Sequence, residues 1–157
     1  MQVIRFAAVA LAATLVVATA TAAGAGPAKN VEVTCTLQMQ TLAPPGASGE
    51  DFGTVDCPSA FGKGVQHDTL TVTPTSPTTA TVIGPFKQFF DTGTIHGTVK
   101  LTASATSEGV VTYKGVAELS GGTGAYRHVK GSAKVECTSP DGGTHTTCTE
   151  KATGTHT

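Results

Sequence analysis

The sequence predicts an all-β fold, a small antiparallel up-and-down β-barrel of about eight strands with two disulfides. Two observations support this prediction. Apolar and polar residues alternate with period two over most of the chain, and no long stretch after the first 25 residues has helical periodicity. Short segments rich in glycine, proline, serine and aspartate separate the alternating runs. A meander of such strands has two unpaired edges, which closure into a barrel removes. An open sandwich of the same strands is the alternative.

The chain begins with the residue order of a secretory signal peptide. Arg5 precedes an uncharged apolar run over residues 6–17, and small residues follow as far as Ala25. This run is shorter than the about 20 apolar residues that a membrane span needs. We therefore expect a signal peptide over residues 1–25 and a single β-barrel domain over residues 26–157. The mature protein is expected to be extracellular, without membrane insertion.

The first half of the barrel domain is less regular than the second. Residues 31–40 alternate strictly and predict a half-buried strand, which Pro44-Pro45-Gly46 ends. Residues 58–67 contain two glycines and are expected to form a loop. Further strands are expected over residues 52–57, 69–73 and 79–83.

The second half alternates over longer runs that are joined by glycine-containing turns. Mid-strand glycines, as at Gly97 and Gly115, suit the bends of a small closed barrel. Strands are expected over residues 95–105, 111–119 and 129–137, and a last one from His145 toward Ala152.

Net charge and composition argue against several classes of partner. The formal net charge is −1, and cleavage after Ala25 would remove Arg5 and make it −2. A nucleic-acid surface requires a concentration of basic residues, so no nucleic-acid partner is expected. Charged residues make up only 13% of the chain. No metal is expected, because the chain has no Cys-x-x-Cys pair, and no cofactor is expected either.

Four cysteines allow three pairings in an exported protein. If Gly142-Gly143 is a two-residue hairpin loop, counting outward along both strands brings Cys137 opposite Cys148. Residues that face each other in an antiparallel pair are close enough for a disulfide. A bridge between Cys35 and Cys57 then follows by elimination.

A glycine-rich segment in the second half of the chain resembles a motif of a known superfamily. The segment from Ser120 to Ala133, with Gly121-Gly122-Thr123-Gly124 and Tyr126, resembles the Gly-Gly-Thr-Gly-x-(Phe/Tyr) stretch of the allene oxide cyclase and dirigent superfamily of β-barrels. Secreted bacterial proteins of unknown role in that superfamily are similar. The resemblance spans roughly residues 85–137. It implies an eight-stranded barrel with an apolar central pocket, often assembled as a homo-oligomer. The motif is structural there, so Gly121, Gly122 and Gly124 are expected to form a turn in which Gly122 or Gly124 has positive φ.

Five residues are candidates for binding a ligand. Phe86, Phe89 and Phe90 form the one aromatic-dense segment and could line a pocket mouth, with a core plug as the alternative. Tyr113 lies on the inward face of its predicted strand. Arg127, if it points inward at a barrel end, needs an anionic partner, which is either a ligand or Glu118 on the neighbouring strand.

Catalytic residues cannot be assigned from the sequence. The pair His67-Asp68, expected in a loop, could orient a proton transfer, with chance adjacency as the alternative. Two functions are therefore considered. The first is a secreted, non-enzymatic barrel that binds a small apolar molecule or has a structural or interaction role. The second is a dirigent- or cyclase-like enzyme that steers a reactive intermediate. Two or more buried ionisable residues converging in the cavity would favour the enzyme.

Overall fold

A computed structural model describes residues 29–58 and 61–156. The predicted signal peptide lies outside these residues. Eight strands and one short 3-10 helix, η1, make up the described chain, and the predicted all-β class is confirmed. In order they are β1 (Lys29–Thr41), β2 (Gly49–Cys57), β3 (Gly62–Pro74), β4 (Thr79–Phe90), β5 (Gly93–Ala105), β6 (Val111–Gly122), η1 (Gly124–Tyr126), β7 (Lys130–Ser139) and β8 (His145–His156).

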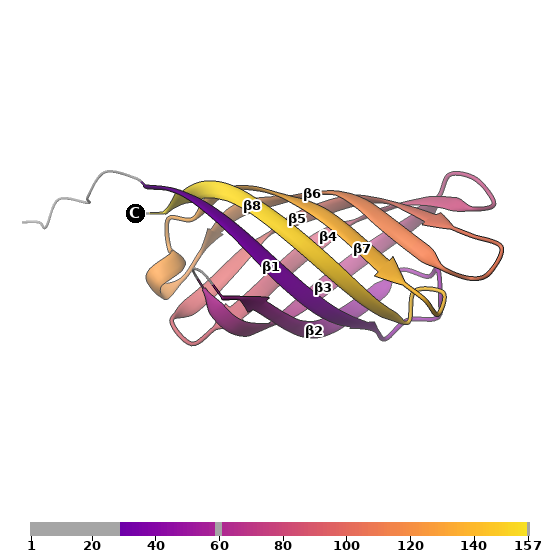
Figure 1. Ribbon diagram of the computed structural model, residues 1–157, viewed down its shortest axis with the longest axis horizontal. Coiled ribbons are helices and arrows are strands. Elements are labelled where there is room, and N and C mark those ends of the chain that lie inside the picture. The colour runs from indigo at the N-terminus through magenta and orange to yellow at the C-terminus, as the bar shows by residue number, and fades with distance from the viewer. Residues whose placement is uncertain (1–28, 59–60, 157) are drawn as a thin grey trace, which may run out of the picture.

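The strands form a closed barrel in sequence order (Figure 1). Each strand pairs antiparallel with the next, and β1 pairs with β8 from Lys29 opposite His156 to Gln40 opposite His145. Closure gives every strand two neighbours, so no edge is left to pair with another chain. The predicted barrel is confirmed over the open sandwich. Among the described residues, no helix is long and apolar enough to cross a membrane.

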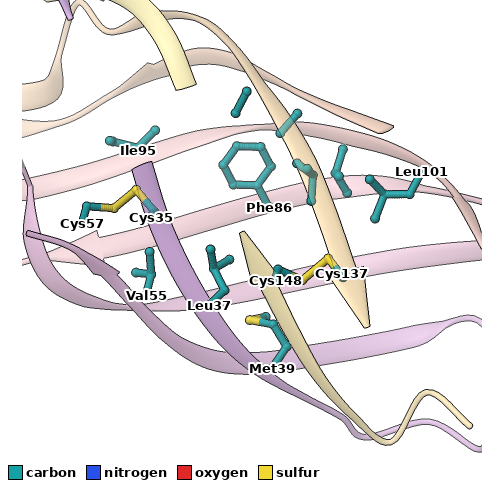
Figure 2. Packing of buried hydrophobic residues seen from close by; sticks show 14 of the residues in the cluster. Cys35, Leu37, Met39, Val55, Cys57, Phe86, Ile95, Leu101, Cys137 and Cys148 are labelled. Atoms are coloured by element: carbon teal, nitrogen blue, oxygen red, sulfur yellow. A yellow bond between two sulfur atoms is a disulfide. The ribbon is translucent and has the colours of Figure 1, made fainter. Parts of the chain in front are cut away.

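The period-two pattern places one face of each strand inside the barrel. In β5, Ile95, Val99 and Leu101 are buried while the residues between them are exposed, apart from Gly97 on the buried face. Both predicted disulfides are confirmed, Cys35 with Cys57 and Cys137 with Cys148. All four cysteines point inward and pack among the apolar core residues (Figure 2).

The start of β3 differs from the sequence-based prediction. The sequence predicts a loop through residue 67, but β3 begins at Gly62. Gly62 does have a turn conformation, with φ of +73°. Gly64, in contrast, lies within the strand, where a Cβ atom would come 2.3 Å from the carbonyl oxygen of Phe89. This glycine allows β3 and β4 to approach closely, which accounts for a glycine inside a strand.

The two ends of the barrel differ. One end carries η1, both described chain ends and the connections after β2, β4 and β6 (Figure 1). Three rings close it: Phe61, Phe90 and Tyr126, whose centroids lie 5.2–5.8 Å apart. We call these three residues the aromatic plug. The connections after β1, β3, β5 and β7 gather at the opposite end.

Candidate functional site

A cavity of about 400 Å³ occupies the half of the barrel that faces away from the aromatic plug. Residues of all four connections at that end line it, for example Pro45, Pro77 and Gly142, so we call this the open end. The cavity wall is mainly apolar. Its aliphatic and sulfur-containing members are Leu37, Met39, Ala47, Leu70, Val72, Ala80, Val82, Val99, Leu101, Ala103, Ala105, Val111, Val135, Cys137 and Cys148.

Polar side chains from two strands form the deep end of this cavity. Gln66 and Asp68 on β3 and Glu150 on β8 all line it and are all buried. On β3, Gln66 and Asp68 lie farther from the open end than Leu70 and Val72 do. We call these three side chains the cavity floor. Gln88 on β4 is buried directly opposite Gln66 in the strand register.

Hydrogen bonds join the cavity floor into one network. Gln66 Nε2 donates to Oδ1 and Oδ2 of Asp68, at 2.9 and 3.0 Å. Gln88 Nε2 donates to Gln66 Oε1 at 2.8 Å and to Glu150 Oε2 at 3.3 Å. The two amides therefore link a carboxyl group on β3 to one on β8, from one side of the barrel to the other. Each carboxyl group receives amide donors from a single side chain, and further acceptor positions on its oxygens are left over.

Burial dominates the electrostatics of the two floor carboxyl groups. It raises the pKa of Asp68 to about 7, with the hydrogen bond from Gln66 opposing and the charges of Asp51 and Glu150 reinforcing the rise. Burial likewise raises the pKa of Glu150 to about 7, against the hydrogen bond from Gln88. Removing a carboxylate from water disfavours its charged form unless a positive charge compensates.

Two further acidic groups line the cavity above the floor. Asp51 on β2 lies directly opposite Asp68, and burial raises its pKa, against a hydrogen bond with Thr41. Tyr113 on β6 lines the wall near the open end, where its hydroxyl lies close to Gly143. Burial also raises the pKa of Tyr113. Every ionisable side chain among the described lining residues is therefore an acid.

The β7–β8 connection beside Tyr113 holds a serine, an aspartate and a histidine in contact. The buried Ser139 hydroxyl donates to Asp141 Oδ1 at 2.9 Å and accepts from the amide of Gly143 at 2.8 Å. His145 Nδ1 contacts Asp141 Oδ2 at 2.6 Å and not the serine. A serine nucleophile would instead bond to the histidine that activates it. These hydrogen bonds hold the turn, and those from His145 and Ser139 keep the pKa of Asp141 below its usual range.

Of the five residues predicted to bind a ligand, Tyr113 alone is among the residues that line this cavity. Phe86 and Phe90 are buried in the core, Phe90 as part of the aromatic plug. Phe89 lies on the outer face, 39% exposed, with Lys87 Nζ 5.0 Å from its ring centroid. Arg127 is exposed at the plug end, immediately after η1.

The structure excludes two arrangements considered from the sequence, an inward Arg127 paired with Glu118 and a loop that holds His67 and Asp68 together. Arg127 and Glu118 are both exposed, and no ion pair joins them within the described chain, because Arg127 lies outside the barrel. His67 and Asp68 lie on a strand rather than in a loop, so they point to opposite faces. His67 stacks on Phe52 on the outer face, with centroids 4.2 Å apart, while Asp68 points into the cavity. The two cannot act together in a proton transfer.

The glycine motif forms the expected structural turn. Gly124 has φ of +58° and Gly121 has φ of +150°. A Cβ atom at Gly122 would lie 2.0 Å from the carbonyl oxygen of Thr94, so the absence of a side chain at Gly122 allows the backbones of β5 and β6 to lie this close together. The turn directs Tyr126 into the aromatic plug, where Thr92 Oγ1 donates to its hydroxyl at 2.6 Å. Among the described residues, no group of three or more potential metal ligands occurs.

Sequence reasoning missed Gln66, Asp68 and Glu150 as cavity residues, and Gln88 as the buried residue that joins them. One signal was available. Glu150 lies two residues after the inward-facing Cys148, and Gln88 lies two residues from both Phe86 and Phe90, so each is expected to point to the same face as those neighbours. A polar residue at such a position is a candidate for the barrel interior.

Comparison with models of known protein families gives no match, and comparison with curated proteins gives none. Among solved structures, that of the pterocarpan synthase dirigent protein GePTS1 is similar to this chain. The TM-score is 0.48, the sequence identity is 15%, and the match covers 83% of this chain and 86% of that chain. These values are too low for the likeness to bear on function.

Proposed function

We propose that this protein binds a small, mainly apolar molecule in the cavity at the open end of the barrel and releases it unchanged. The observation that supports this most directly is the cavity itself. Its volume of about 400 Å³ lies within the usual range of small-molecule pockets, and its wall is mainly aliphatic. Protein interiors are normally filled, and an empty volume of this size weakens the packing around it. A ligand would restore those contacts.

A barrel enzyme of the dirigent or cyclase kind is the second candidate. Asp68 and Glu150 meet the criterion set from the sequence, since both are buried and both line the cavity. Two points favour binding. Acid–base pairs usually have environments that push their pKa values apart, whereas burial brings both of these to about 7. No lysine, arginine or histidine among the described lining residues could stabilise an anionic intermediate.

The disulfides support the proposal that the protein works outside the cell, because such bonds persist in oxidising compartments. Sequencing the N-terminus of the exported protein tests this. We expect a mature chain that begins between Ala20 and Lys29. A chain that still begins at Met1 would contradict export through a cleaved signal peptide.

Binding can be tested by titrating the protein with a neutral, environment-sensitive fluorophore such as prodan. Saturable binding is expected for the wild type and for Phe89→Ala, which alters only the outer face. Ala103→Leu adds volume to the cavity wall and should weaken binding by about ten-fold or more, by displacing the probe. If Phe89→Ala weakens binding and Ala103→Leu does not, the ligand binds at Phe89 instead. Chemical conversion of a small molecule that co-purifies with the protein would favour the enzyme.

A further inference from the structure

The charges around the cavity have one sign. Asp51, Asp68 and Glu150 carry its carboxyl groups, and Tyr113 carries an acidic hydroxyl. Among the described lining residues there is no lysine, arginine or histidine. A buried carboxylate without a compensating cation is costly, so each of the two floor carboxyl groups requires either a proton or a positively charged partner. Nothing in the described barrel wall supplies such a partner.

The hydrogen-bond network suits carboxyl groups in their charged form. Gln66 directs its amide group to both oxygens of Asp68, and Gln88 directs its amide group to Glu150. An ionised carboxylate only accepts hydrogen bonds, so these amides stabilise the charged state of each group. Because each amide side chain approaches from one side, acceptor positions remain for a donor that enters through the cavity.

The charged residues in the connections at the open end are acidic, like those that line the cavity. The open-end connections, residues 42–48, 75–78, 106–110 and 140–144, contain no lysine or arginine, and their charged members are Glu108 and Asp141. His145, just beyond the last of them, is in contact with Asp141. At the plug end, the basic residues Lys63, Arg127 and Lys130 occur together with the acidic residues Asp56 and Asp91, so no single sign dominates there. A cleft lined by charges of one sign concentrates ligands of the opposite sign.

We propose that the ligand of this cavity is a monocationic amphiphile, a compact apolar body that carries one protonated amine, with the ammonium group bound by Asp68 and Glu150 on the cavity floor. The proposal rests on the binding function proposed above. An ammonium group has three donors and one positive charge, so it would donate to the free acceptor positions and compensate one of the two floor carboxylates, while the other can retain its proton. The apolar body would contact the aliphatic wall. A bare metal ion would leave that wall without a partner.

Three probes that share one body test this ligand class: phenethylamine, phenethyl alcohol and phenylacetate. Their affinities for the full mature protein are measured by isothermal titration calorimetry at about pH 8, where the amine is charged and the floor carboxylates are largely ionised. We expect the amine to bind about ten-fold or more tightly than the alcohol, and phenylacetate to bind weakest. In the double variant Asp68→Asn/Glu150→Gln, the amine should lose this advantage while the alcohol keeps its affinity. Glu50→Gln, on the outer face, is the matched control and should behave as the wild type.

The outcomes separate this proposal from the one on which it rests. Equal affinities of amine and alcohol in the wild type would overturn the ligand class and leave the apolar pocket standing. Failure of all three probes and of prodan would overturn the pocket as well. If calcium ions displace the amine from the cavity floor, the floor is a metal site, and the proposal of an amphiphilic amine ligand is overturned. The wild-type comparison needs no variant, so misfolding of the double variant would not rescue the proposal.

Discussion

Replacing Asp68 by asparagine should change the pH dependence of stability in a defined direction. Burial raises the pKa of this carboxyl group from 3.8 to about 7, so the folded barrel holds its proton more tightly than the unfolded chain does. The group's contribution to stability is then fully present below about pH 4 and is lost as the pH rises toward about 7. At about pH 8 the folded state carries the whole cost of ionising a buried group.

The size of the effect follows from the pKa change. Each pKa unit corresponds to about 1.4 kcal/mol, so the rise from 3.8 to about 7 costs at most about 4 kcal/mol at alkaline pH. The asparagine side chain of the variant has no charge to bury, and its carbonyl oxygen can still accept a hydrogen bond from Gln66. We expect the free energy of unfolding of Asp68→Asn, relative to wild type, to increase by about 2–4 kcal/mol between about pH 4 and about pH 8. Any effect of the new amide that does not depend on pH cancels in this difference.

Urea titrations of the oxidised protein, followed by far-ultraviolet circular dichroism at both pH values, measure this quantity. Asp91→Asn, in the exposed β4–β5 turn, is the control and should give about zero difference. If Asp68→Asn differs from wild type by the same amount at both pH values, Asp68 does not have a raised pKa in the folded state. The electrostatic account of the cavity floor would then fail.

Two more predictions concern the frame of the barrel. Gly124→Ala should lower the free energy of unfolding by about 2 kcal/mol or more, because φ is +58° and the new Cβ would lie 2.2 Å from the carbonyl oxygen of Thr92. Gly109 has a similar positive φ but open space around it, so Gly109→Ala should lower the free energy of unfolding by only about 1 kcal/mol. Equal losses for the two variants in urea titrations would show that the contact between the new Cβ and the Thr92 carbonyl oxygen is unimportant. Peptide mapping without reduction should recover Cys137 joined to Cys148, and replacing both by alanine should destabilise the barrel by about 2–4 kcal/mol. A loss near zero would mean that this bridge does not constrain the unfolded chain.

The frame of the barrel could be predicted because its signals are local. The alternation from Ile95 to Ala103 needs only period two, and the structure buries the predicted face. The pairing of Cys137 with Cys148 needed only the position of the Gly142-Gly143 turn, which fixes the register of β7 and β8. Each inference uses residues close together in the sequence, where strand geometry leaves few choices.

The cavity floor could not be predicted in the same way because its residues break the pattern that identifies strands. Gln66 and Asp68 are polar residues at inward positions, so the start of β3 lacks an apolar face and its sequence is typical of a loop. Their neighbours also come from distant segments. Gln88 reaches Gln66 from 22 positions away and Glu150 from 62. Only closure of the barrel brings β8 across from β3 and β4, and no local pattern contains that information.

The cavity floor also divides the barrel into two halves that differ in how tightly their side chains are packed. On the plug side, Val55, Ile95 and the Cys35–Cys57 bridge are tightly buried, and substitutions there would remove packing on which folding depends. On the open side, the cavity leaves space next to most wall residues, so changes of side-chain size need not displace neighbours. The open half can therefore diverge to accept new ligands while the plug half preserves the fold. In related barrels, sequence variation should accumulate toward the open end.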